Sequence, residues 1–435
     1  MAKKQSSPAA ATDPGREYTV VARRYRPRQF ADLVGQEAVA QALQNAIKSG
    51  RVAHAYLFTG ARGVGKTSTA RILAKCLNCI HGPTVTPCDK CDICKAIADG
   101  QDVDVQEIDG ASNRGIEDAR AIRNNVATRP QRARYKIYII DEVHMLTRES
   151  FNALLKTLEE PPPHVKFIFA TTEVQKIPIT ILSRCQRFDF GGINTARILE
   201  QLKQIAAQEG VKADEEALRI VARRAGGSMR DAQSLLEQLL SFGGEKLTAQ
   251  TVHQLLGTAT DDRVVEIATA ALARDPAKAL GLVAQCADEG LQLGELLDQM
   301  IEYWRGLMLL NCSEGEIGEL TVADHHRETV RKQAKELTLD TILAGLDVLS
   351  TTKARLRISA HGQVLIEMAI VRLSRLDELV PVSQLAHWLS QPGSAPAGTT
   401  RPAAPPVSVG AATADGSKKN GMTAPAEGFR PGSNG

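Results

Sequence analysis

The sequence lacks any run of 18 or more apolar residues, which is about the length that a helix needs to cross a membrane. The chain begins with MAKKQSSPAAATDPGREY, which has two lysines but no apolar stretch, so it does not resemble a signal peptide or a membrane anchor. We therefore expect a cytoplasmic protein with no membrane partner.

The sequence also has little net charge. Lysine and arginine number 53 and aspartate and glutamate 50, which gives a formal net charge of +3. A surface this balanced does not attract polyanions over its whole area, so any contact with nucleic acid must come from a local basic patch. Eight cysteines are present. In a reducing compartment we expect them to be free thiols or metal ligands rather than disulfides.

The 435 residues predict about two to four domains. Residues 1–17 and 390–435 are rich in proline and small residues, and we expect both tails to be disordered. Residues 18–193 alternate short β-branched runs with helical patterns, which predicts an α/β domain with a parallel sheet flanked by helices. Three short amphipathic helices are expected in residues 194–257. Residues 258–389 remain helical, either for association or as an ordinary core.

A phosphate-binding loop is predicted by GARGVGKT, which fits G-x-x-x-x-G-K-[ST] between the expected strand AYLF and the expected helix STARILAKCL. Glycines let backbone amides turn toward phosphate oxygens, Lys66 supplies a charge to the β- and γ-phosphates, and the Thr67 hydroxyl can bind Mg²⁺. The expected nucleotide contacts of this loop are Gly60, Ala61, Arg62, Gly63, Val64, Gly65, Lys66, Thr67 and Ser68.

Two carboxylates follow the apolar strand KIYII, at the edge where open α/β sheets bind ligands. We expect Asp141 to hold Mg²⁺, through water, and Glu142 to polarise the attacking water. An acidic turn at the end of a strand is the alternative. We expect His144 only to pack or to form hydrogen bonds.

Two threonines end the strand VKFIFATT at the same predicted edge. The hydroxyls of Thr171 and Thr172 could contact the γ-phosphate or the attacking water. The pattern alone favours this role no more than a structural one.

Two arginines lie in unexpected places. Gly226–Gly227 closes one expected helix and Ser228 caps the next, so Arg230 falls in the first turn of that second helix. A cation there is repelled by the positive end of the helix dipole, which destabilises the helix by a few tenths to about 1 kcal/mol. A bound phosphate would explain it, and pairing with a nearby carboxylate is the alternative. Arg184, in ITILSRCQRFDF, is far from the loop, and the residues alone favour a surface arginine.

Four cysteines in a C-x8-C-x2-C-x2-C arrangement within residues 76–97 predict a structural, tetrahedral Zn²⁺ site. The predicted zinc ligands are Cys79, Cys88, Cys91 and Cys94. His81 in place of Cys79, or redox-active thiols, are alternatives, and Cys76 is a spare thiol. We expect three isolated cysteines to be buried or inert, namely Cys185, Cys286 and Cys312.

Several long motifs together carry a family resemblance: YRPRQFADLVGQE, GARGVGKTS, the four-cysteine insertion, IDEVHMLTRESFNALLKTLEEPP, ATTEVQKIPITILSRC and GSMRDAQSLL. Over about residues 18–375 the sequence closely resembles the gamma/tau subunits of bacterial DNA polymerase III clamp loaders, which are AAA+ ATPases. The resemblance implies an AAA+ core with a zinc insertion, a helical lid and a helical collar that oligomerises.

The resemblance also implies a function. With the delta and delta-prime subunits and further copies of itself, such a subunit uses ATP binding to open the sliding clamp and place it on primed double-stranded DNA, and hydrolysis releases it. The single-stranded DNA-binding protein system is a further implied partner. The chain stops inside a Pro/Ala-rich tail, so we expect a short gamma form or a truncated tau form. The polymerase core is a partner only of a longer tau form.

Roles for individual residues follow from the same resemblance. Arg184, in Ser183-Arg184-Cys185, matches the arginine finger that reaches the ATP of a neighbouring subunit, and Arg230 matches the second sensor of its own chain. The adenine-pocket positions are Arg26, Pro27 and Val34. Clustered positive charge could also meet DNA phosphates at Arg114, Arg120, Arg123 and Arg148.

Two other functions remain open. One is a scaffold that is stabilised by zinc and binds nucleotide without turnover. The presence of Lys66, Asp141 and Glu142, which turnover would need, argues against it. The other is a different AAA+ DNA motor, such as a branch-migration helicase, which would need a DNA-binding module after the lid.

Overall fold

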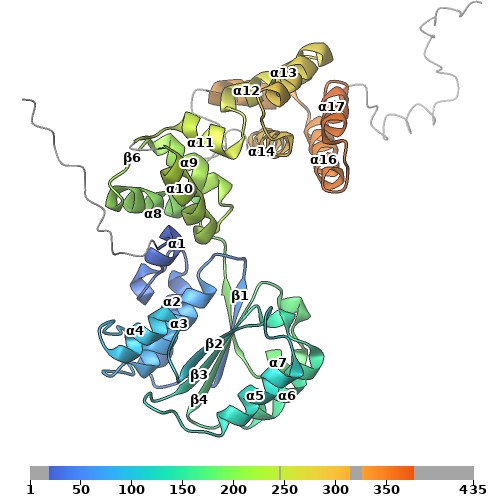
Figure 1. Cartoon of the computed structure of the whole chain (residues 1–435). Coiled ribbons are helices and arrows are strands. Elements are labelled where there is room, and N and C mark those ends of the chain that lie inside the picture. The colour runs from blue at the N-terminus through green and yellow to red at the C-terminus, as the bar shows by residue number, and fades with distance from the viewer. Residues whose placement is uncertain (1–18, 244–245, 314–325, 377–435) are drawn as a thin grey trace, which may run out of the picture. The chain divides into compact units, whose positions relative to one another are not determined.

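A computed structural model of the chain describes residues 19–243, 246–313 and 326–376 (Figure 1). The tails that we expected to be disordered, 1–17 and 390–435, lie outside the described residues. Within the described ranges, none of the helices combines the length and the apolar character needed to span a bilayer.

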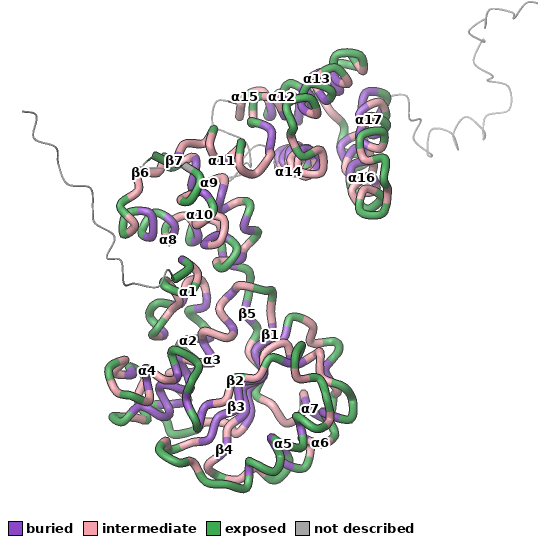
Figure 2. The backbone as a smooth tube through the Cα atoms, in the orientation of Figure 1, coloured by how far each residue is buried: buried purple, intermediate pink, exposed green. Residues whose placement is uncertain are grey.

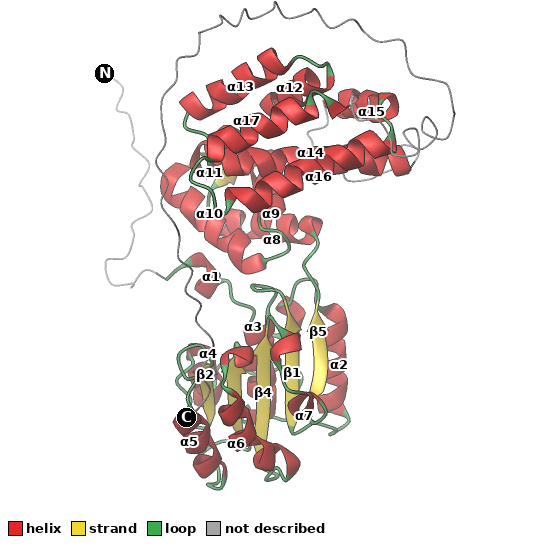
Figure 3. Ribbon diagram, turned by 90° about the vertical axis from the view of Figure 1, so that its right-hand side faces the viewer, coloured by secondary structure: helices red, strands yellow, loops and turns green. Residues whose placement is uncertain are grey.

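The predicted parallel sheet is confirmed in the described part of the chain. Five parallel strands lie in the order β2-β3-β4-β1-β5 (Figure 3). They are β1 (Ala55–Gly60), β2 (Val105–Asp109), β3 (Lys136–Asp141), β4 (Val165–Thr171) and β5 (Gln186–Phe190). The three inner strands are buried along nearly their whole length (Figure 2), as their continuous apolar sequences require.

Helices cover both faces of this sheet (Figure 1). On one face lie α2 (Glu37–Lys48), α3 (Lys66–Asn78) and α4 (Asp92–Asp99), and on the other lie α5 (Ile116–Val126), α6 (Arg148–Glu159) and α7 (Ile179–Leu182). Strand residues alternate between the two cores, so that Phe58 packs in one and Leu57 in the other. The remaining short helices are α1 (Val21–Arg24), η1 (Phe30–Asp32), η2 (Val143–Met145) and η3 (Val174–Lys176).

The predicted lid range is helical and has its own core, which includes Leu202, Val221 and Leu236. Its elements are α8 (Thr195–Gln208), β6 (Lys212–Ala213), α9 (Glu215–Arg224), α10 (Met229–Gly243), β7 (Lys246–Leu247) and α11 (Ala249–Leu256). The fourth helix, α11, and the pairing of β6 with β7 were not predicted. These elements have two to eight residues, too few for a clear hydrophobic period.

In the described part of the predicted collar range, helices are the only regular secondary structure. Its helices are α12 (Asp261–Leu272), α13 (Pro276–Asp288), α14 (Leu293–Cys312), α15 (Arg327–Glu336), α16 (Leu339–Leu356) and α17 (Gly362–Leu373). Trp304 of α14 is fully buried against Gly345 of α16, where an added Cβ would overlap the indole. Helix α17 buries Ile370, whereas Val364 and Met368 are 52% and 44% exposed, so one of its faces is open.

Candidate functional site

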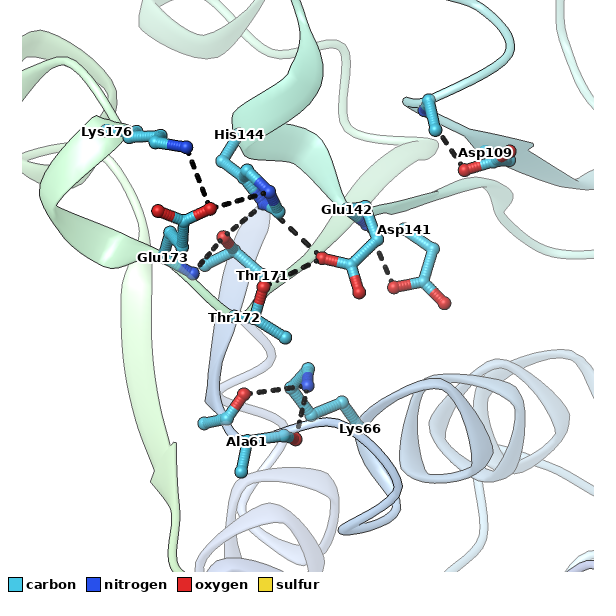
Figure 4. A network of polar contacts seen from close by, with 12 residues as sticks. Ala61, Lys66, Asp109, Asp141, Glu142, His144, Thr171, Thr172, Glu173 and Lys176 are labelled. Carbon is cyan, nitrogen blue, oxygen red and sulfur yellow. Dashed lines mark hydrogen bonds and ion pairs between the residues drawn. The ribbon is translucent and has the colours of Figure 1, made fainter. Parts of the chain in front are cut away.

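The predicted phosphate loop connects the end of β1 to the start of α3. Gly65 precedes the helix with φ of +104°, and Gly63 has φ of +76°, which are conformations that side chains disfavour. The Lys66 side chain is 6% exposed, and its Nζ donates to the carbonyl oxygens of Gly60 and Ala61 at 2.8 and 2.7 Å (Figure 4). Burial lowers the pKa of Lys66, and the charges of Glu142 and Asp141 oppose this shift.

Two oxygen ligands that suit Mg²⁺ meet beside the loop. The Thr67 hydroxyl donates to Asp141 Oδ2 at 2.5 Å. Mg²⁺ prefers hard oxygen ligands and is often held by one or two carboxylates together with substrate phosphates. A threonine hydroxyl and a strand-end carboxylate in direct contact therefore fit this ion.

Glu142 follows β3 directly and has a left-handed backbone with φ of 46° and ψ of 44°. For a residue with a side chain this conformation costs about 1–2 kcal/mol, and such strain is often found at functional sites. The Thr172 hydroxyl donates to Glu142 Oε2 at 3.2 Å. The carboxylate thus lies at the edge of the sheet where β1, β3 and β4 end.

The two threonines after β4 differ in surroundings. Thr171 is fully buried, and its hydroxyl oxygen lies 3.0 Å from His144 Nδ1 and accepts the N–H of Glu173 at 3.0 Å. Thr172 instead reaches Glu142. The hydroxyl that this geometry offers to a ligand is that of Thr172, whereas we had expected either one.

Arg230 lies in the first turn of α10, beside the loop. Ser228 accepts the N–H of Asp231 at 3.2 Å, which confirms the predicted cap. The N–H of Arg230 points to the Gly63 carbonyl oxygen at 3.4 Å, and a Cβ on Gly63 would overlap Ser228 Oγ. The start of α10 therefore lies directly against the phosphate loop.

The three predicted adenine-pocket residues line one pocket. It has a volume of about 480 Å³, between the segment around η1 and helix α8. Its lining includes Arg26, Pro27, Val34, Arg197, Glu200 and Gln204. Burial lowers the pKa of Arg26, and the charges of Arg71 and Arg230 add to this effect.

Arg184 follows α7, and its side chain is 32% exposed. Its guanidinium donates to Glu159 Oε1 at 2.7 Å and to the Thr180 carbonyl oxygen at 2.7 Å. Sequence reasoning missed Glu159, because it lies 25 residues earlier at the end of α6 and only the fold brings it close.

The four predicted zinc ligands form one cluster. Their Sγ atoms all lie within 4.8 Å of one another, and a tetrahedral site with Zn–S bonds of about 2.3 Å would place them about 3.8 Å apart. Backbone amides point at the sulfurs, from Cys91 to Cys88 and from Cys94 to Cys91 at 3.4 Å each. Such donors stabilise thiolates, so the cluster fits a closed zinc site.

The other thiols stand apart from this cluster. His81 is exposed and is not part of the group of sulfurs. Burial raises the pKa of Cys76 to about 12, so this thiol stays protonated. Of the three isolated cysteines, Cys286 is buried, Cys185 is partly buried and Cys312 is exposed.

The four arginines considered for DNA contact are exposed, on α5, on the loop before it and at the start of α6. Helices α5 and α6 lie side by side on one face of the sheet (Figure 1). Arg120 pairs with Glu117 at 2.6 Å, so part of this charge is already neutralised.

Comparison with known families covers most of the chain. Residues 35–194 match the family described as "DNA polymerase III, delta subunit". Residues 197–245 match "DNA polymerase III clamp loader subunit, ATPase lid domain", and residues 247–389 match "DNA polymerase III subunits gamma and tau domain III". DNA polymerase III subunit gamma of Buchnera aphidicola (subsp. Acyrthosiphon pisum) is 38% identical over 358 residues, which are 82% of this chain and 98% of that protein. The chain belongs to the DNA polymerase III gamma/tau subunit family.

Longer members of the gamma/tau family extend beyond the matched region. DNA polymerase III subunit tau of Salmonella typhimurium is 42% identical over 407 residues, which are 90% of this chain and 63% of that protein. This chain therefore spans less than two thirds of the length of that tau relative. Among solved structures, Thermotoga maritima RuvB aligns with a TM-score of 0.42 at 18% identity over 57% of this chain and 78% of that one, too distant to bear on function.

Proposed function

We propose that this gamma/tau family member is an ATPase motor subunit of a bacterial replicative clamp loader. ATP binding would drive opening of the sliding clamp and its loading onto primed DNA, and hydrolysis would release it. The observation that carries the proposal is the contact of Thr67 with Asp141, next to Lys66 and Glu142, at the carboxyl edge of the sheet.

In the proposed reaction, each of these residues has one task. Lys66 exchanges its two loop carbonyl partners for phosphate oxygens, and Thr67 with Asp141 holds Mg²⁺. The ion, when bound, neutralises charge that develops on the phosphates. Glu142 accepts a proton from the attacking water, while Arg230 contributes positive charge from the lid.

We propose that the pocket is completed in trans. Arg184 would reach the nucleotide of a neighbouring subunit, which could be another copy of this chain, delta or delta-prime. Exposed apolar side chains support assembly through α16 and α17, at positions one helical turn apart. They are Leu339, Leu343, Val364 and Met368.

The test is ATP hydrolysis by the purified chain, alone and with partner subunits, clamp and primed DNA. We expect slow hydrolysis by the chain alone and marked stimulation in the complete mixture. Nucleotide binding without turnover in any mixture would instead support the scaffold function.

A substitution at Gly63 tests the contact between the loop and the lid. Gly63→Ala should weaken ATP binding and destabilise the fold by more than about 1 kcal/mol, because a side chain is strained at φ of +76° and would also overlap Ser228 Oγ. Nucleotide titration and thermal unfolding measure the two effects. Gly50→Ala is the matched control, since Gly50 has φ of +70° but open space around it. Equal ATP affinity in the two variants would contradict the role of the contact.

We also propose that the four-cysteine cluster holds one structural Zn²⁺ ion. Elemental analysis of reduced, freshly purified protein should find about one zinc per chain. Cys91→Ser should lose most of it, whereas Cys312→Ser, which changes an exposed cysteine outside the cluster, should keep it. Metal-free protein in the unchanged chain would overturn the assignment.

A further inference from the structure

His144 lies in η2, two residues after Glu142, and its side chain is 7% exposed. Its ring is placed between the ends of β3 and β4 (Figure 4). Nδ1 lies 3.3 Å from Glu142 Oε2 and 3.0 Å from Thr171 Oγ1, and Nε2 lies 3.3 Å from Glu173 Oε1. Both ring nitrogens are therefore engaged by groups of the proposed ATPase site and its surroundings.

The contacts select one oxygen of Glu142. His144 and Thr172 both reach Oε2. A carboxylate held through Oε2 presents Oε1 to a ligand, and a general base works only when the proton it takes lies within hydrogen-bond reach. The backbone of Glu142 is strained, and such a conformation persists only where the surrounding structure holds it.

The far side of the ring is anchored as well. Glu173 Oε1, which faces His144 Nε2, also accepts from Lys176 Nζ at 2.8 Å, and the N–H of Glu173 donates to Thr171 at 3.0 Å. The ring is planar and rigid, so fixing Nε2 also fixes the position of Nδ1.

We propose that His144 is a positioning residue for ATP hydrolysis. As an imidazolium with an N–H on each nitrogen, it donates from Nε2 to Glu173 Oε1 and from Nδ1 to Glu142 Oε2, so that Oε1 takes the proton of the attacking water. This inference rests on the proposed ATPase function. It gives a role to a histidine that the sequence suggested only for packing or hydrogen bonding.

The test compares three variants of the full chain in the assembled complex. His144→Ala should lower kcat by about 10- to 100-fold, because misplacing a catalytic group by about 1 Å can cost about 100-fold. ATP affinity should change by no more than about twofold, since His144 does not bind the nucleotide. His144→Asn should restore most of the kcat, because its amide nitrogen can take the place of Nδ1. His144→Gln, whose amide reaches the place of Nε2, should restore less.

His164→Ala is the matched control, since His164 lies immediately before β4 and contacts the Val126 carbonyl oxygen. Unchanged kcat in His144→Ala would overturn the inference, as would rescue by glutamine but not by asparagine. A parallel loss of ATP affinity and thermal stability in both His144→Ala and His144→Asn would assign a structural role instead. The unchanged complex, measured alongside, separates the two proposals: its failure to hydrolyse ATP would overturn the ATPase function as well.

Discussion

Glu142→Gln is expected to bind ATP as the unchanged chain does and to hydrolyse it about 10²- to 10⁴-fold more slowly in the assembled complex. Glutamine keeps the shape of the side chain and an oxygen that can accept the Thr172 hydroxyl, which now lies 3.2 Å from Glu142 Oε2. It cannot take a proton from water. Single-turnover hydrolysis and nucleotide titration, measured on the same preparation, separate the chemical step from binding.

Glu149→Gln is the control for this experiment. Glu149 is an exposed carboxylate in the first turn of α6, and losing its charge should leave turnover unchanged. If Glu142→Gln hydrolysed ATP at the rate of this control, Glu142 would not be the base. If it lost ATP binding as well, its main contribution would be to the ground state rather than to the chemical step.

The sheet could be predicted because its inner strands are buried on both faces. Continuous apolar runs such as KIYII and VKFIFA leave few other structures open, and a phosphate loop after the first of the inner strands sets the edge where ligands bind. The cysteine spacing was informative for a similar reason, since four thiols close in sequence need only local turns to meet.

The contacts that refine the site could not be predicted. Glu142 and Thr172 lie 30 residues apart, and Arg184 and Glu159 lie 25 apart, so each pair meets only because parallel strands and their helices are placed side by side. Short elements such as η2 and α7 have three and four residues and no measurable period. The sequence of α17 is apolar on most of its faces, so it did not show which face is buried and which is exposed, as the face with Val364 is.

Arg184→Ala is expected to leave ATP binding by the altered chain nearly unchanged and to reduce turnover of the assembled complex by about 10³- to 10⁵-fold. An arginine finger stabilises charge on the phosphoryl group in the transition state, so its loss affects the chemical step of the neighbour's site. The ion pair with Glu159 does not prevent this role. Both side chains are partly exposed, at 32% and 49%, and such pairs contribute at most about 1 kcal/mol. Breaking the ion pair with Glu159, so that Arg184 can contact a neighbour's triphosphate, therefore costs little free energy.

Arg187→Ala separates a finger from a general loss of positive charge. Arg187 lies three residues further along, is more exposed than Arg184 and pairs with Asp189 at 2.7 Å, so its removal should leave turnover within about twofold of the unchanged complex. Because the proposed pocket is shared, the Arg184→Ala defect should appear only in the assembly and should not alter the slow hydrolysis by an isolated chain. Equal turnover by Arg184→Ala and unchanged complexes would remove the finger. A verified monomer that hydrolyses ATP as fast as the full assembly would remove the shared pocket itself.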